Sequence, residues 1–378
     1  MGRIIRGPLY KDTKTKRLVH RLRRGAVAVV SHQDLDAVAS EDLIRCRPAA
    51  VINTQKFLTG SYPTRGTKLL IKAGVVLLEV DDDTIFELPE NTGVEIRGNE
   101  INCQGLLVIK ARRINSSYIA QVMQDARDNM PRRLRDFVEN TITFAQREKS
   151  LLLKEPPIPS IETDMEGQPV LVAVRGRSYR TDLQAMRTYI NEQSPVIVAV
   201  DGAADALLDL GYWPDILLGD MDSVSGEVLH RCAEKGTELV VHGYTDGRAP
   251  GQERVVEMGL AHQVFSVGGT SEDAALLLAD SLGAELIVAV GTHSDPVEFM
   301  EKGRAGMAST MLVRLRVGEK LVDAKGVSEL YRTEPQPADM LWVLGAGLIP
   351  AVVLLWGSPA FNMLFRLLLV HFRATLGV

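Results

Sequence analysis

Residues 196–223 read VIVAVDGAADALLDLGYWPDILLGDMDS, and this stretch decides the fold of the region around it. The apolar run 196–200 is typical of a strand buried on both faces of a parallel sheet, and it ends at Asp201. Alanines and leucines at helical spacing follow, and a second apolar run, 216–218, ends at Gly219 and Asp220. The stretch therefore predicts a strand, a helix and a second, parallel strand.

In an open parallel sheet the ligand crevice lies beyond the carboxyl ends of the strands, where Asp201, Asp220 and Asp222 are expected. Three carboxylates repel one another unless a cation or several hydrogen-bond donors stabilise them. Mg²⁺ prefers such oxygen ligands and shares them with substrate phosphates, so Asp220 and Asp222 are candidate metal ligands, with Gly202 and Ser223 beside the bound molecule. A simpler interpretation is that Asp201 caps the helix and that Asp222 and Ser223 form a turn.

Other predicted strands also end in candidate ligand-binding residues. Arg175, Gly176 and Arg177 follow the first strand of this region, and their guanidinium groups either bind phosphate oxygens or face solvent. Gly269 and Thr270 precede a helix whose free N–H groups could meet an anion. A threonine N-cap followed by acidic residues would be complete as ordinary helix capping.

The turns described above carry a resemblance to a known family. The motifs are Asp201-Gly202-Ala203-Ala204, Leu210-Gly211, Pro214-Asp215 and Gly219-Asp220-Met221-Asp222-Ser223. They resemble the signature of thiamine pyrophosphokinases, over about residues 170–318 of this chain. The resemblance implies that the acidic turns hold Mg²⁺ and ATP, or another nucleotide, for pyrophosphoryl transfer.

The layout of the whole chain is similar to the SteA family of bacterial cytokinetic-ring proteins. That resemblance implies a nucleotide- or phosphate-binding scaffold for cell division. It also implies a membrane-associated coiled-coil partner, SteB, at the division site, and control of peptidoglycan hydrolysis during daughter-cell separation. The alternative is an active Mg-ATP-dependent diphosphokinase.

One loop departs from the kinase pattern. Where thiamine pyrophosphokinases continue an acidic motif into a helix, residues 242–251 read HGYTDGRAPG, and only Thr245 and Asp246 resemble that motif. Arg248 either binds a nucleotide phosphate or pairs with a nearby carboxylate. No run of strands follows residue 320 to shape a vitamin pocket, so we expect no classical thiamine diphosphokinase activity. No catalytic residue is assigned.

Composition excludes several classes of protein. The net charge of −5 argues against nucleic-acid binding, and the three scattered cysteines indicate neither disulfides nor a zinc site. Residues 3–24 form a basic segment that includes Lys14 and Lys16; it is either a solvated surface or a site for anionic lipid or an acidic partner.

Four segments are expected along the chain. They are a basic arm with a β-rich α/β domain (1–115), a helical linker (116–159), a thiamine pyrophosphokinase-like α/β domain (160–330) and an apolar tail (331–378). Alternating strand and helix patterns predict a doubly wound, mostly parallel sheet in the third segment. The linker helix should break or kink at Pro131, and its apolar stripe suits a homodimer.

The tail has no charged residue from 340 to 365, with Trp342 and Trp356 near the ends of its first apolar run. This pattern favours a membrane anchor that holds the protein at the cytoplasmic face of the inner membrane. The alternative is a pair of helices packed between subunits. Sequence alone does not decide whether such an anchor spans once, spans twice or lies in the interface.

Overall fold

The computed structural model describes residues 4–330, with only the backbone described at 329 and 330, and scattered residues beyond them. Those are 346, 358, 359, 361–363, 366, 367, 370 and 371. Residues up to Ser328 form one compact unit. Within it we call residues 4–114 the N-terminal lobe and residues 160–328 the central lobe.

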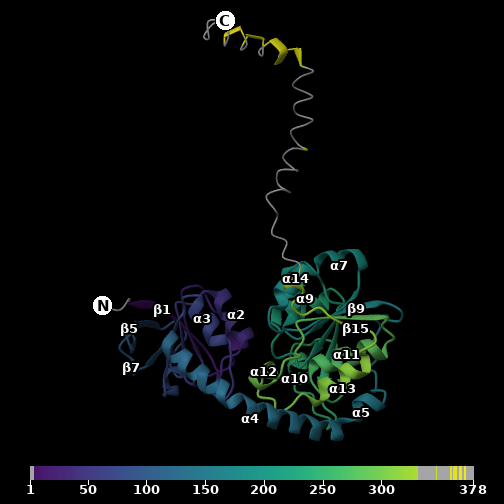
Figure 1. The fold of residues 1–378 in the computed structure, drawn as a ribbon, viewed down its shortest axis with the longest axis horizontal. Helices are drawn as coiled ribbons and strands as arrows, with labels where there is room; N and C mark the ends of the chain where they lie inside the picture. Colours follow the sequence, from purple (N-terminus) through teal and green to yellow (C-terminus); the bar gives the residue numbers. More distant parts are fainter. Residues whose placement is uncertain are drawn as a thin grey trace. The chain divides into compact units, whose positions relative to one another are not determined.

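The N-terminal lobe is built on an eight-stranded mixed sheet (Figure 1). Its elements are β1 (Ile5–Asp12), α1 (Thr15–Leu18), β2 (Val27–Val30), α2 (Ala37–Cys46), β3 (Ala50–Asn53), α3 (Gly66–Lys72), β4 (Val76–Glu79), the 3₁₀ helix η1 (Asp83–Phe86), β5 (Gly93–Arg97), β6 (Glu100–Cys103), β7 (Leu107–Lys110) and β8 (Arg112–Ile114). The strand order is β7-β6-β5-β1-β2-β3-β4-β8. Strands β1 to β4 are parallel, and the outer strands pair antiparallel to their neighbours.

Alternation along β2 divides the core of this lobe in two. Ala28 and Val30 join the cluster that packs against the helices, whereas Val27 and Val29 join the cluster formed with β5, β6 and β7. All four side chains are fully buried, as the apolar run in the sequence predicts.

The basic segment at the N-terminus is not a free arm. Residues 5–12 form β1, which lies inside the sheet between β2 and β5. Leu9 and Tyr10 are buried there, but Pro8 and the flanking charges hide the strand pattern in the sequence.

The central lobe contains a seven-stranded parallel sheet in the order β13-β12-β11-β10-β9-β14-β15. Its elements are β9 (Pro169–Ala173), α6 (Tyr179–Ala185), α7 (Arg187–Gln193), β10 (Val196–Val200), α8 (Ala203–Asp209), β11 (Ile216–Gly219), α9 (Gly226–Glu234), β12 (Glu238–Gly243), α10 (Gln252–Glu257), β13 (Gln263–Ser266), α11 (Ser271–Ser281), β14 (Leu286–Val290), α12 (Pro296–Glu301), α13 (Ala308–Val317), β15 (Leu321–Asp323) and α14 (Val327–Leu330). The predicted α/β fold with a mostly parallel sheet is confirmed.

Helices cover both faces of this sheet, because alternate residues of each strand belong to different cores. Val170 and Val172 of β9 pack in the cluster that holds α11 and α13, whereas Leu171 and Ala173 pack in the cluster that holds α7 and α8. Figure 1 shows α11 and α13 on the opposite side of β9 from α7.

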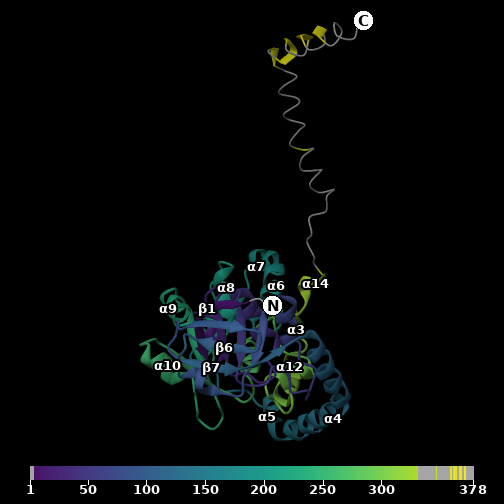
Figure 2. The same cartoon turned by 90° about the vertical axis from the view of Figure 1, so that its left-hand side faces the viewer.

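A long helix, α4 (Ser116–Glu148), connects the two lobes, and the short α5 (Ser150–Leu153) follows it. It packs against α3 of the N-terminal lobe and α13 of the central lobe (Figures 1 and 2). The expected break at Pro131 is absent, since α4 continues through this residue. Pro131 and Arg127 are both exposed, so the carbonyl that loses its N–H partner can be hydrated.

The expected anchor region, 340–365, lies almost entirely outside the described residues. Among the residues that the structure does describe, none of the helices combines the length and the apolar character needed to cross a membrane.

An ion pair joins the lobes directly. Asp42 of α2 is buried and accepts a hydrogen bond from the guanidinium group of Arg175, which follows β9 in the central lobe. Arg45 also contacts Asp42, at 2.7 Å, but its side chain is half exposed.

We expect Arg175→Met to lower the free energy of unfolding by about 2 kcal/mol, because it leaves a buried carboxylate with only one exposed partner. Urea denaturation would measure the loss. Arg248→Met is the control, since Arg248 and its partner Asp246 are both solvent-exposed. Equal stability of the two variants would mean that the Arg175 pair does not hold the lobes together.

Candidate functional site

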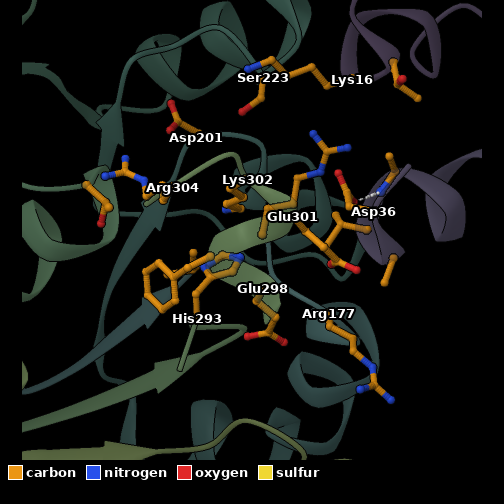
Figure 3. A pocket seen from close by; sticks show the side chains of 18 of the residues that line it. Lys16, Asp36, Arg177, Asp201, Ser223, His293, Glu298, Glu301, Lys302 and Arg304 are labelled. Carbon is orange, nitrogen blue, oxygen red and sulfur yellow. Dashed lines mark hydrogen bonds between the residues drawn. The ribbon is translucent and has the colours of Figure 1, made fainter. Parts of the chain in front are cut away.

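A cavity of about 660 Å³ lies at the carboxyl ends of the central strands, and residues of both lobes line it. Lys14, Lys16, His32, Asp36 and Arg65 line it from the N-terminal lobe. Arg175, Arg177, Asp201, Asp220, Asp222, Ser223, Thr270, Glu272, His293, Glu298, Glu301, Lys302 and Arg304 line it from the central lobe. Figure 3 shows Asp201, Ser223 and Lys16 at one end of this cavity and His293 and Glu298 at the other.

The acidic turns are built as the sequence predicts. Asp201 follows β10 with a φ of 48°, and its carboxylate accepts a hydrogen bond of 2.9 Å from the N–H of Met221, in the turn after β11. Asp201 thus ties two neighbouring turns together and does not cap α8, whose N-cap is Gly202. A Cβ on Gly219 would lie 2.0 Å from Oδ1 of Asp201, so the close approach of this carboxylate requires glycine.

The turn after β11 is held from three sides. The N–H of Gly202 donates to Oγ of Ser223 at 3.2 Å. The guanidinium group of Arg254 donates to the carbonyls of Met221 and Val224. The N–H of Asp222 donates to Oδ1 of Asp220 at 3.2 Å within the turn itself.

The acidic residues lack full compensation for their burial. Burial, with the nearby Asp220 carboxylate, raises the pKa of Asp201 to about 8. Burial and the contact with Asp222 raise the pKa of Asp220 to about 6. These shifts mark a site where added positive charge would be strongly stabilising.

The N-terminal lobe supplies the positive charge nearest to these acids. Nζ of Lys16, in α1, lies 2.5 Å from both carboxylate oxygens of Asp222, and Nζ of Lys14 lies 3.8 Å from Oδ2. Burial alone would raise the pKa of Asp222, but its contacts with Asp220 and Lys16 lower it overall. Nothing in the sequence pattern links Lys16 to an aspartate two hundred residues away.

Three further predicted residues also line the cavity: Arg175, Arg177 and Thr270. Thr270 forms a capping box with Asp273, in which each side chain accepts from the other residue's N–H. The ordinary-capping interpretation of this helix start is therefore the one the structure shows. Gly176, Gly202 and Gly269 lie beside the cavity without lining it.

Asp246 and Arg248, in the loop after β12, do not reach the cavity. Arg248 donates to the Asp246 carboxylate at 2.7 Å, both side chains are exposed, and neither lines the cavity. Of the two possibilities for Arg248, the structure shows the pairing with a carboxylate.

Segment 293–304 contributes residues that the sequence did not single out as a group. Burial and the nearby Asp36 raise the pKa of Glu301 to about 7, although the Thr64 hydroxyl donates to it at 3.0 Å. Lys302 lines the cavity, and desolvation by the surrounding protein lowers its pKa.

His293 follows β14 and lines the cavity. It is 5% exposed, and its Nδ1 lies 2.9 Å from the Glu272 carboxylate, which also accepts the His293 N–H. Within the described part of the chain its Nε2 is buried and has no hydrogen-bond partner. This unsatisfied atom in the wall of the cavity is a second indication of a ligand site.

The described residues contain no group of three or more His, Cys, Asp or Glu side chains arranged to hold a metal ion. Mg²⁺ is commonly bound through one or two carboxylates, with waters and phosphate oxygens completing its shell. Asp220, whose pKa is raised, and the neighbouring Asp222, whose present cation is Lys16, fit that arrangement. A metal here would neutralise ligand phosphates and would not be bound by protein groups alone.

Comparison with protein families first defines the class of the central lobe. Residues 187–246, which contain Asp201, Asp220 and Asp222, match the thiamin pyrophosphokinase catalytic domain. Residues 325–375 match the SteA-like C-terminal domain. Each match covers a short segment of the chain, and the two agree with the resemblances to thiamine pyrophosphokinases and to the SteA family that the sequence shows.

Curated relatives cover only part of this chain. The 6-hydroxymethyl-7,8-dihydropterin pyrophosphokinase of Methanocaldococcus jannaschii is 34% identical over 24% of this chain and 37% of its own length. The protein of the same description from Pyrococcus furiosus is 35% identical over 25% of this chain and 44% of its own length. The chain therefore spans less than half the length of these relatives.

Two solved structures are similar in part. Thiamine pyrophosphokinase from Bacillus subtilis has 18% identity and a TM-score of 0.26, covering 41% of this chain and 59% of its own. A 3-isopropylmalate dehydratase from Methanocaldococcus jannaschii has 16% identity and a TM-score of 0.23, covering 32% of this chain and 89% of its own. Likenesses with such low TM-scores carry no structural argument.

The raised pKa of Asp201 predicts a pH-dependent loss of stability. The folded chain holds a proton up to about pH 8 that the unfolded chain releases above its ordinary value of 3.8, so stability falls as pH rises through that window. Asp201→Asn keeps the oxygen that accepts from Met221 but removes the charge. We expect the gain in melting temperature of this variant to be larger at pH 8 than at pH 5. An equal gain at both pH values would contradict a protonated, desolvated Asp201.

Proposed function

We propose that the cavity binds a phosphorylated ligand together with Mg²⁺, and that ATP or another nucleotide is the first candidate. The observation that carries this proposal is the set of three desolvated carboxylates at neighbouring strand ends, in a cavity that cationic side chains line from both lobes. Asp220 and Asp222 would hold the metal, which would supply charge neutralisation when bound. Arg175, Arg177 and Ser223 would position the ligand.

We further propose that the protein acts as a SteA-type scaffold in cell division. The match of residues 325–375 to the SteA-like C-terminal domain supports this role. In it the chain would work as a homodimer at the division site with a SteB-like membrane partner, and would control peptidoglycan hydrolysis during daughter-cell separation. The ligand site would then sense whether a nucleotide is bound, and the protein would not need to catalyse a reaction on it.

Active pyrophosphoryl transfer is the second candidate function. The observation in its favour is the 34% identity to a 6-hydroxymethyl-7,8-dihydropterin pyrophosphokinase in a stretch of 92 residues. A hydroxymethyl group on a flat heterocycle would then be the acceptor. Thiamine is the less favoured acceptor because the loop of Asp246 and Arg248 lies away from the cavity.

The ligand proposal predicts that ATP raises the melting temperature of the full chain only when Mg²⁺ is present. Asp220→Asn combined with Asp222→Asn should abolish this rise, because both metal ligands lose their charge. Asp246→Asn is the matched control, an exposed aspartate of the same lobe outside the cavity. If no nucleotide in a broad panel shifts the wild-type melting temperature, the acidic site is purely structural.

An assay of AMP release decides between scaffold and enzyme. With ATP and thiamine we expect no thiamine diphosphate, because Asp246 and Arg248 do not line the cavity. AMP formed with 6-hydroxymethyl-7,8-dihydropterin, and lost in the doubly substituted variant, would establish the second candidate. Steady production of thiamine diphosphate would contradict the proposal.

For the C-terminal segment we propose a membrane anchor that keeps the lobes at the cytoplasmic face. Full-length protein should remain in the membrane fraction after high-salt and carbonate washes, and removal of residues 339–378 should release it. The uncharged stretch 340–365 is the reason, since apolar area of this size must be buried in lipid or in a partner. A soluble full-length dimer that becomes monomeric on truncation would instead identify an oligomerisation element.

A further inference from the structure

We propose that Lys16 is a movable counter-ion of the acidic site, paired with Asp222 when no ligand is bound and with ligand phosphates when a metal polyphosphate binds. This inference rests on the ligand site proposed above and adds the N-terminal lobe to it. The class of ligand is a magnesium polyphosphate, whether a nucleoside triphosphate or inorganic pyrophosphate.

The geometry of the pair is the first observation. Nζ of Lys16 lies 2.5 Å from both oxygens of Asp222, so the ammonium group occupies the coordination positions that a cation on this carboxylate would use. Lys16 and Asp222 are about one third and one quarter exposed, and both line the cavity. Neither group is locked in a dry interior, and the long lysine side chain can swing.

The surroundings of Lys16 give the second observation. Residues on both sides of its helix α1 also contact the acidic turns: Nζ of Lys14 lies 3.8 Å from Asp222, and Nε2 of His20 lies 3.3 Å from the carbonyl of Ser223. The helix therefore remains beside the site when a single ion pair is exchanged. Lys16 can move from a carboxylate to a neighbouring phosphate without separation of the lobes.

Electrostatics gives the exchange two opposite consequences. A metal ion alone must compete with the ammonium group for Asp222, so Lys16 weakens binding of the bare cation. A metal polyphosphate brings negative charge with the metal, so Lys16 gains a phosphate partner and strengthens its binding. A residue that serves only to hold the lobes together would not change the two affinities in opposite directions.

Titration calorimetry on the full chain at low ionic strength tests this inference with Mg²⁺ alone, Mg-ATP and Mg-pyrophosphate as probes. Lys16→Met should bind Mg²⁺ alone about tenfold more tightly and both polyphosphates about tenfold more weakly, the change expected for one charge-assisted hydrogen bond. Arg17→Met is the matched control, because it removes the same charge from the same helix at an exposed position that does not line the cavity. It should leave all three affinities unchanged.

The outcomes separate this inference from the proposed function. Suppose that the wild-type chain binds both polyphosphates. If Lys16→Met then leaves this binding intact, or weakens it together with the binding of Mg²⁺ alone, the role of Lys16 is overturned and the ligand site stands. Wild-type chain that binds neither polyphosphate would overturn the ligand site and this inference together. Lys16→Gln, which retains a hydrogen-bond donor to Asp222 without the charge, replaces Lys16→Met if that variant does not fold. A loss confined to Mg-ATP would identify a nucleotide, and an equal loss for both probes would identify the polyphosphate group itself.

Discussion

The desolvation of carboxylates at two neighbouring strand ends is the constraint on which the rest of the site depends. Asp201 and Asp220 directly follow the neighbouring parallel strands β10 and β11, and burial raises the pKa of each. Isolated carboxylates in such a place are costly, so the fold keeps them only with nearby donors and cations. The N–H of Met221 and the ammonium group of Lys16 supply part of that compensation.

This constraint explains why the two lobes form one unit. The N-terminal lobe contributes Lys16 to the acidic turns, and the central lobe contributes Arg175 to the buried Asp42 of α2. Each lobe therefore holds charge that the other neutralises. Helix α4 adds apolar contact along both, including Phe137 against Phe299 at 6.3 Å between ring centroids. A ligand in the cavity would act on the interface as well as on the site.

Local patterns in the sequence were sufficient to predict the central sheet and its acidic turns. Continuous runs rich in β-branched residues indicate strands buried on both faces. An aspartate directly after such a strand must lie at the carboxyl ends of the sheet's strands, where the ligand crevice is expected. The N-terminal strand was missed because only Leu9 and Tyr10 are buried and Pro8 interrupts the pattern. Pro131 was expected to break or kink the linker helix, but α4 continues through it, and its exposed position makes the lost hydrogen bond inexpensive.

The cations of the site could not be predicted in the same way. Lys16 appears in the sequence as one of many basic residues in an N-terminal segment, and its pairing with Asp222 depends on how separate lobes pack. The same holds for Arg65 and Lys302, which line the cavity from the ends of two helices, α3 and α12, that are far apart in the chain. Arg248 shows the converse case, since it stands near the motif in sequence but outside the cavity in space.

A crystal structure of the full chain with Mn²⁺ and a non-hydrolysable ATP analogue would test the central claim most directly. The arrangement predicts an anomalous peak at direct coordination distance from Asp220 and Asp222, with a phosphate oxygen beside Nζ of Lys16. A metal and nucleotide bound away from these carboxylates, or a Lys16–Asp222 pair that stays intact beside the bound ligand, would contradict it.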